Sequence, residues 1–320
     1  MTPLGDVLSR WALVRERLGT VIIGQDRVKE EVLTCLLAGG HALLEGVPGT
    51  GKTLLALALA RLFGCRFQRV QFTPDLMPAD LLGVSVYEPR TQTFEFKAGP
   101  IFTDILLADE LNRTPPRTQA ALLEAMQEAA ATIDGQRHPI SLVFTVLATQ
   151  NPVEFEGTYP LPEAQRDRFL MRVDIDYPTA ADETRMLAAY ASGRRLHTDA
   201  VAALEPVMTV DELVASRATV ARGVRVDETI LGYIQRLVAT TRGHESVQLG
   251  ASPRASLAVL ETSRALAALR DRDFVTPDDV KWVARPVLVH RVVLSAEAEM
   301  EGLAREDLIR RLVESVEVPR

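Results

Sequence analysis

The apolar residues of this 320-residue chain follow two patterns, which change at about residue 190. Before that point, short unbroken apolar runs alternate with stretches in which apolar residues recur every three or four positions. Unbroken runs are typical of strands buried on both faces, and the wider spacing is typical of amphipathic helices. We therefore expect an α/β domain over residues 1–190, with a mostly parallel sheet flanked by helices.

The short buried strands predicted for this sheet are His41–Glu45, Arg66–Phe72, Ile105–Ala108, Leu142–Ala148 and Met171–Ile175. Two further segments interrupt the alternation and are expected to be hairpin insertions, one near residues 83–97 and one at 131–140. The second contains Asp134-Gly135, which is a strong signal for a two-residue hairpin turn.

After residue 190 the strand signals disappear, and Ala, Leu, Val and Arg recur at helical spacing. Ser252-Pro253 and Thr276-Pro277 each fit a helix N-cap followed by proline at the first helical position. The pattern predicts a second, smaller, all-helical domain over residues 191–320.

Composition narrows the class of protein. The net charge of −7 and the pI of about 5.4 argue against a large basic face for nucleic acid. Since no run of about 18 uncharged apolar residues and no signal-peptide pattern is present, we expect a cytoplasmic protein without a membrane span. Cys35 and Cys65 lie thirty positions apart, so we expect two buried thiols and neither a disulfide framework nor a cysteine zinc site.

The first motif with a chemical implication runs from Gly46 to Thr53, directly after a predicted strand and before the helix-forming run Leu54–Phe63. Its spacing, G-x-x-x-x-G-K-T, matches the Walker A phosphate-binding loop. In such a loop, consecutive backbone N–H groups and the helix dipole face a polyphosphate. We expect Lys52 to reach the β- and γ-phosphates and the Thr53 hydroxyl to hold Mg²⁺. The flanking strand and helix argue against the alternative, a chance glycine-rich turn.

A second motif is the apolar run Ile105–Ala108, which ends in Asp109 and Glu110. Asp109 fits the Walker B partner of Mg²⁺, and Glu110 fits the base that polarises the attacking water. Taken alone, the motif could equally be a strand followed by a solvated acidic turn. The Walker A motif upstream favours the functional interpretation.

Three further residues are candidates. Asn151 follows a predicted strand and could orient water against the γ-phosphate, although Asn-Pro is also a common turn. Arg168 precedes a predicted strand and could stabilise γ-phosphate charge in the transition state. Arg254 lies in the first turn of a predicted helix, where a bound phosphate would offset the unfavourable dipole. From the residue pattern alone, a structural or solvated side chain is the simpler interpretation of each arginine.

Together these motifs resemble the AAA+ ATPases, and more narrowly the MoxR family, over about residues 10–300. The stretches that carry the resemblance are Val21–Gln25, Leu44–Gly49, Asp109–Pro116, Arg117–Gln127, Ala148–Pro152, Glu156–Gln165, Gly250–Ala255 and Val275–Val280. The Walker motifs alone would mark any P-loop ATPase, whereas Asn112–Pro116 and Glu156–Gln165 are far more specific.

The resemblance implies roles for the candidates. Asn151 is similar to sensor 1, Arg254 to sensor 2 of the lid domain, and Arg168 to the arginine finger offered to a neighbouring subunit. Because Arg166 stands where family members often have Leu, either Arg166 or Arg168 could act in trans. The roles of two more arginines, Arg113 and Arg117, stay open in the same way. The cofactor-binding set for ATP and Mg²⁺ then comprises Gly24, Gln25, Gly46, Pro48, Gly49, Thr50, Gly51, Lys52, Thr53, Leu54 and Asp109.

The resemblance also implies an assembly and partners. Such ATPases form rings, commonly hexamers, with the active site between subunits. The two predicted hairpins are similar to the helix-2 insert and the pre-sensor-1 hairpin of the clade. Family members act as chaperone-like motors that mature or insert cofactors into client complexes, often with a partner that carries a metal-binding von Willebrand A domain.

The function expected from the sequence is Mg²⁺-dependent ATP hydrolysis, with ATP in the cleft between the α/β domain and the lid. Two alternatives remain. A nucleic-acid motor of the same clade is disfavoured by the acidic pI, and a nucleotide-gated scaffold without turnover is disfavoured by Glu110.

Overall fold

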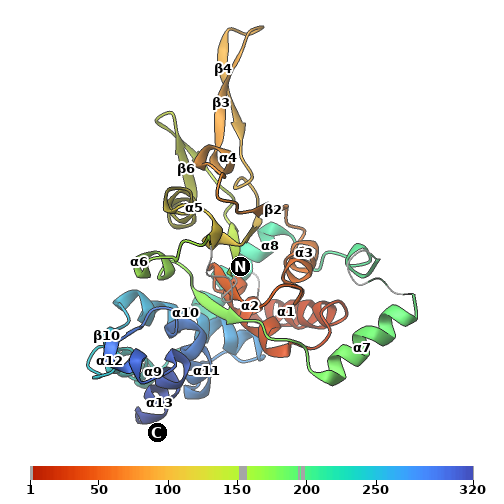
Figure 1. Ribbon diagram of the computed structural model, residues 1–320. Coiled ribbons are helices and arrows are strands. Elements are labelled where there is room, and N and C mark those ends of the chain that lie inside the picture. The colour runs from red at the N-terminus through yellow and green to blue at the C-terminus, as the bar shows by residue number, and fades with distance from the viewer. Residues whose placement is uncertain (1–2, 151–156, 194, 196–198, 320) are drawn as a thin grey trace.

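The computed structural model describes residues 3–319 apart from 151–156, 194 and 196–198. In it, an α/β part carries two projecting hairpins on one side and a cluster of helices on the other (Figure 1). Within the described residues, no helix combines the length and the apolar character needed to cross a membrane.

The central sheet has five parallel strands in the order β2-β5-β8-β1-β9, which confirms the predicted α/β class. The strands are Ala42–Glu45 (β1), Phe67–Gln71 (β2), Ile105–Asp109 (β5), Thr145–Gln150 (β8) and Met171–Asp174 (β9). Strand β8 begins three positions later than predicted. The reason is a turn in which the Phe144 N–H bonds the Ser141 carbonyl, so that Leu142 is 84% exposed.

Successive residues of the strands pack into two separate apolar clusters, one on each face of the sheet. On one face, Leu44 and its neighbours contact α1 (Leu4–Gly19), α2 (Asp26–Leu37) and α3 (Lys52–Leu62). On the other face, Leu43 and Leu106 contact α4 (Pro78–Leu82) and α5 (Pro116–Glu128). Burial on both faces is why the central strands β1, β5 and β8 are mostly apolar, whereas the edge strands β2 and β9 also carry polar residues.

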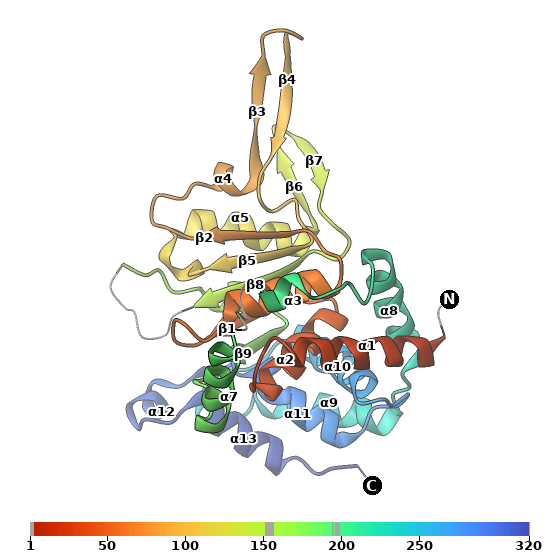
Figure 2. The same ribbon diagram turned by 90° about the vertical axis from the view of Figure 1, so that its right-hand side faces the viewer.

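The two insertions are hairpins, as predicted. The first pairs β3 (Gly83–Glu88) with β4 (Thr93–Ala98), and the second pairs β6 (Ala130–Ile133) with β7 (Gln136–Pro139). Both project from the same end of the α/β part (Figure 2). They contact each other where the Phe96 and His138 rings lie 4.1 Å apart between centroids.

The C-terminal part is helical, as predicted, and packs against the same core as α1–α3. Its helices are α8 (Val210–Gly223), α9 (Glu228–Thr240), α10 (Pro253–Leu269), α11 (Pro277–Leu288), α12 (Ala296–Met300) and α13 (Arg305–Ser315). It also contains a small antiparallel ribbon of β10 (Val247–Leu249) and β11 (Val293–Leu294), which the sequence reading did not include. Strands of two and three residues are too short to show an alternating pattern. A domain boundary near residue 190 stays a prediction.

Candidate functional site

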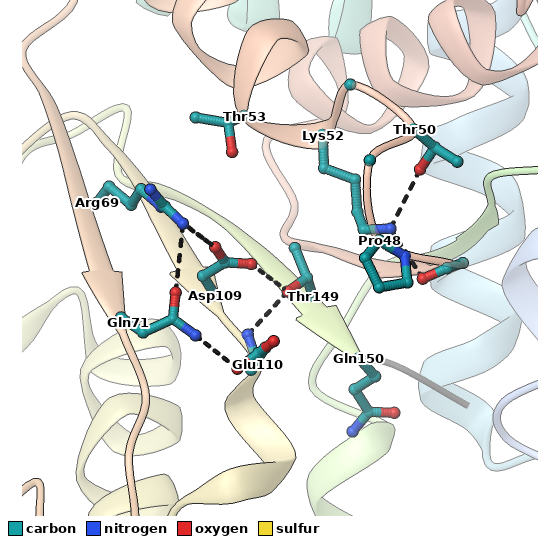
Figure 3. A pocket seen from close by; sticks show the side chains of 13 residues that line it. Pro48, Thr50, Lys52, Thr53, Arg69, Gln71, Asp109, Glu110, Thr149 and Gln150 are labelled. Carbon is teal, nitrogen blue, oxygen red and sulfur yellow. Dashed lines mark hydrogen bonds and ion pairs between the residues drawn. The ribbon is translucent and has the colours of Figure 1, made fainter. Parts of the chain in front are cut away.

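The glycine-rich segment Gly46–Thr53 joins the end of β1 to the start of α3 and lines a cavity of about 310 Å³ (Figure 3). Glycine is required at position 46, because a Cβ there would lie 2.2 Å from the Ile175 carbonyl oxygen. Gly51, at the N-cap of α3, has a φ of +86°, in the left-handed region that favours glycine. The loop can therefore pass close to the neighbouring chain and still turn its backbone into the cavity. The predicted loop residues that line the cavity are Gly46, Pro48, Gly49, Thr50, Gly51, Lys52 and Thr53.

Lys52 lies folded over this loop. Its Nζ donates to the carbonyl oxygens of Gly46 at 2.8 Å and Val47 at 2.7 Å, and to the Thr50 hydroxyl at 3.2 Å. Burial lowers the pKa of the Lys52 ammonium, and the Asp109 carboxylate opposes this shift. All three ammonium donors thus have oxygen partners that phosphate oxygens could replace.

Asp109 ends β5 on the wall facing the loop, and each of its carboxylate oxygens has a partner. Oδ1 accepts from the Thr149 hydroxyl at 2.7 Å, and Oδ2 accepts from Arg69 Nη2 at 2.6 Å and Nε at 3.1 Å. In Figure 3 the Thr53 hydroxyl points from the loop wall towards the Asp109 side of the cavity. A carboxylate and a hydroxyl on facing walls are oxygen donors of the kind that Mg²⁺ takes, so these residues fit that ion.

Glu110 follows Asp109 with a φ of +56°, an uncommon conformation for a residue with a side chain. Its N–H donates to the Thr149 hydroxyl at 2.8 Å, and its carboxylate accepts from Gln71 Nε2 at 2.6 Å. The same carboxylate pairs with Arg113 Nε at 3.0 Å. The two acids are therefore held by one threonine hydroxyl, and the Glu110 carboxylate is turned towards the wall of the cavity.

Sequence reasoning missed Arg69, Gln71 and Thr149, which all line this cavity. They come from β2 and β8, the two strands that flank β5 in the sheet. Gln71 is the register partner of Asp109, and it ends β2, one position before the end of the predicted strand Arg66–Phe72. A polar residue at the carboxyl end of a buried strand was the signal that could have found it.

A second, smaller cavity of about 110 Å³ adjoins the other side of the loop and includes Leu54. Gln25 lies at its edge with a φ of +52°, and its Nε2 donates to the Thr50 carbonyl at 3.3 Å. Gly24 lies outside the lining, where a Cβ would come within 2.4 Å of the Asp182 carboxylate. The cavity is mostly apolar, and the residues that line it are Val21, Ile22, Ile23, Gln25, Gly49, Thr50, Gly51, Leu54, Pro178, Met186 and Tyr190.

The structure brings Arg168 and Arg254 together, but on a third cavity of about 400 Å³. This cavity includes His41 and Leu170, which directly precede β1 and β9, whereas the glycine loop follows β1. It therefore lies at the opposite edge of the parallel sheet from the glycine loop.

The prediction that ATP lies in a cleft between the α/β domain and the lid needs correction. Within the described part of the chain, no residue beyond 190 lines either cavity at the glycine loop. The physical reason is that α10 docks against α2 and beside the strand starts, away from the loop (Figure 2).

The remaining arginine candidates differ in their contacts and exposure. Arg166 pairs with Glu163 at 3.2 Å, and burial together with Arg305 lowers its pKa. Arg117 is exposed on α5. Asn151 lies outside the described residues, and the preceding residue, Gln150, lines the 310 Å³ cavity.

Comparison with known proteins adds to this geometry. The family described as "ATPase family associated with various cellular activities (AAA)" matches residues 41–171, and the AAA lid domain matches 239–312. The chain is 46% identical to protein YeaC of Bacillus subtilis over 304 residues, covering 95% of this chain and 93% of that one. It is 41% identical to Chaperone MoxR1 of Mycobacterium tuberculosis over 309 residues, covering 94% of this chain and 80% of that one. A crystal structure of a protein from Cytophaga hutchinsonii, described as "a putative ATPase", superposes with a TM-score of 0.89 at 37% identity, covering 98% of this chain and 96% of that one.

Proposed function

Because the chain belongs to the MoxR family of AAA+ ATPases, we propose that it hydrolyses ATP with Mg²⁺ and uses the reaction to remodel or mature a client protein complex. The observation that carries the proposal is the 310 Å³ cavity, where the glycine loop and Lys52 face Asp109 and Glu110. The client activity is supported by the chaperone name of the Mycobacterium tuberculosis relative.

The cavity supports a division of roles among its residues. The triphosphate lies along Gly46–Thr53, with Lys52 turned from the loop carbonyls to phosphate oxygens. Thr53 and Asp109 hold Mg²⁺, which neutralises phosphate charge when it is bound. The adenine ring occupies the apolar 110 Å³ cavity beside Leu54 and Gln25.

Glu110 is proposed as the base that polarises the attacking water. For this role its carboxylate must leave Gln71 and Arg113, which hold it against the cavity wall. The hydrogen bond that the Glu110 N–H donates to the Thr149 hydroxyl fixes the Glu110 backbone while the side chain turns. Asn151, beyond the end of β8, is proposed as the second residue that orients this water.

We infer that Arg168 and Arg254 act on the nucleotide of a neighbouring subunit, since their cavity opens at the opposite edge of the sheet from their own glycine loop. Arg168 is assigned as the finger in preference to Arg166, because Arg166 is paired with Glu163. This arrangement supports a ring of subunits, for which the family implies a hexamer. A von Willebrand A domain partner stays part of the proposal.

The test compares Glu110→Gln with wild type and with Glu16→Gln, an exposed control on α1. Glu110→Gln should bind ATP normally and release phosphate about 10²–10⁴-fold more slowly, the usual contribution of a general base. Lys52→Ala should lose ATP affinity. Turnover at the wild-type rate in Glu110→Gln would show that another group acts as the base. Phosphate release by wild type also separates this function from a scaffold that binds ATP without turnover.

A further inference from the structure

Arg168 and Arg254 lie on one cavity, although they come from distant parts of the chain. Arg168 belongs to the loop between α6 (Glu163–Arg166) and β9, and Arg254 belongs to the first turn of α10. If both are to meet the same phosphate, something must fix the loop and the helix start relative to each other. The contacts beneath the two arginines show what does so.

Arg291, which follows α11, is bonded to the backbone of the loop. Its side chain is 2% exposed, and its guanidinium donates to the carbonyl oxygens of Phe169 at 2.6 Å and Leu170 at 3.0 Å. His290 adds a contact of 3.0 Å between its Nε2 and the Phe169 carbonyl oxygen. The segment after α11 therefore holds the loop that presents Arg168.

Asp167 links this arrangement to α10. Its Oδ1 accepts from Arg291 Nε at 2.7 Å, and its Oδ2 accepts from the Ser252 hydroxyl at 3.3 Å. Ser252 is the N-cap of α10, two positions before Arg254. One carboxylate, adjacent in sequence to Arg168, thus contacts the start of the helix that carries Arg254.

Charge reinforces the geometry. Burial lowers the pKa of Arg291, and the Arg254 charge lowers it further, while the Asp167 carboxylate opposes both effects. Asp167 is thereby a counter-charge among the arginines that surround the cavity. Without it, guanidinium groups on the two chain segments would repel each other.

We propose that Asp167 is a positioning residue that joins the Arg168 loop to the start of α10, so that both arginines meet a neighbour's phosphate as one preorganised pair. The proposal rests on the assignment of these arginines to a neighbouring subunit. Because the pair is ordered in advance, it avoids the loss of conformational entropy that two separate segments would suffer at the transition state.

Asp167→Asn is the main variant, because it keeps the shape and removes the charge. It should lower phosphate release about 10–100-fold, the scale of a misplacement of about 1 Å, and leave ATP affinity unchanged. The matched control is Asp279→Asn. Asp279 is fully buried in the helical part, accepts from Arg272 Nη1 at 2.7 Å and does not line this cavity. The control should lower the melting temperature without the same loss of turnover.

Mixing subunits separates positioning in trans from general damage. Asp167→Asn subunits retain their own glycine loop, and Lys52→Ala subunits retain their arginines. Combining the impaired Asp167→Asn protein with the inactive Lys52→Ala protein should raise turnover above that of either alone, because the second protein supplies intact arginines to the first. The reference mixture is Arg168→Ala with Lys52→Ala.

The outcomes distinguish the two proposals. If the reference mixture regains activity and the Asp167→Asn mixture does not, the substitution damages the nucleotide site of the variant subunit itself. The positioning of arginines for a neighbour's phosphate is then wrong. If the reference mixture stays inactive, the assignment in trans is wrong and the inference falls with it. Full activity of Asp167→Asn alone would also overturn it. If that variant does not fold, Ser252→Ala, which breaks one contact of the same carboxylate, should give a smaller loss that mixing repairs.

Discussion

Replacing Arg69 with glutamine should lower the Mg²⁺ concentration at which the protein binds MgATP. In the structure, the Arg69 guanidinium occupies Oδ2 of Asp109, the carboxylate proposed to hold Mg²⁺. The other oxygen, Oδ1, accepts from Thr149. Arg69 would therefore compete with a metal ion for the Asp109 carboxylate.

The size of the effect follows from the exposure of the pair. The Arg69 side chain is 49% exposed and that of Asp109 is 17% exposed, so the pair is closer to a surface ion pair than to a buried one. Such pairs are worth up to about 1 kcal/mol. Because about 1.4 kcal/mol is a tenfold change in binding, the half-saturating Mg²⁺ concentration should fall by about two- to fivefold.

The assay is the fluorescence of a labelled ATP analogue titrated with free Mg²⁺, repeated with phosphate release. Arg66→Gln is the matched control, because Arg66 and Asp104, which directly precede the same two strands, pair at 3.2 Å and do not line the cavity. It should leave the Mg²⁺ requirement unchanged. An equal or higher Mg²⁺ requirement in Arg69→Gln would refute the competition and would indicate that Arg69 binds the loaded nucleotide.

Two further predictions concern stability. Trp11→Ala should lower the free energy of unfolding by about 3–5 kcal/mol in guanidinium titrations, because the buried indole packs on Phe63 with ring centroids 5.2 Å apart; a loss below about 1 kcal/mol would contradict this packing role. Burial raises the pKa of Glu31 from 4.5 to about 7, so the folded chain keeps a proton that the unfolded chain releases, and stability is lost as pH rises through that range. Glu31→Gln should flatten this part of the pH profile in thermal melts between pH 5 and 8, and a profile identical to wild type would count against it.

The parts of the site that follow one another along the chain could be predicted from sequence. The glycine loop and the Asp109-Glu110 pair are local motifs, and their spacing is set by the turn and the strand that carry them. Arg69 and Thr149 could not be predicted, because they reach Asp109 only through the strand order β2-β5-β8. No local sequence pattern predicts which strands will be neighbours in the sheet.

The position of the helical part was unpredictable for a related reason. Amphipathic spacing predicts that α10 is a helix with one apolar face, but many surfaces can cover such a face. Its docking against α2 is decided by the fit of the whole core. Arg254 therefore had a predictable place in its helix and an unpredictable place relative to the glycine loop.

If the arginines act on a neighbour as proposed, the two cavities on opposite edges of one sheet make the two ends of each subunit different. A surface that supplies arginines and a different surface that receives them associate head to tail, and such contacts either close on themselves or continue as an open helix. In an open row, one terminal subunit has a nucleotide cavity that no neighbour completes, and the other terminal subunit offers its arginines to none. Only a closed assembly completes every cavity, so closure itself would determine how many sites can turn over.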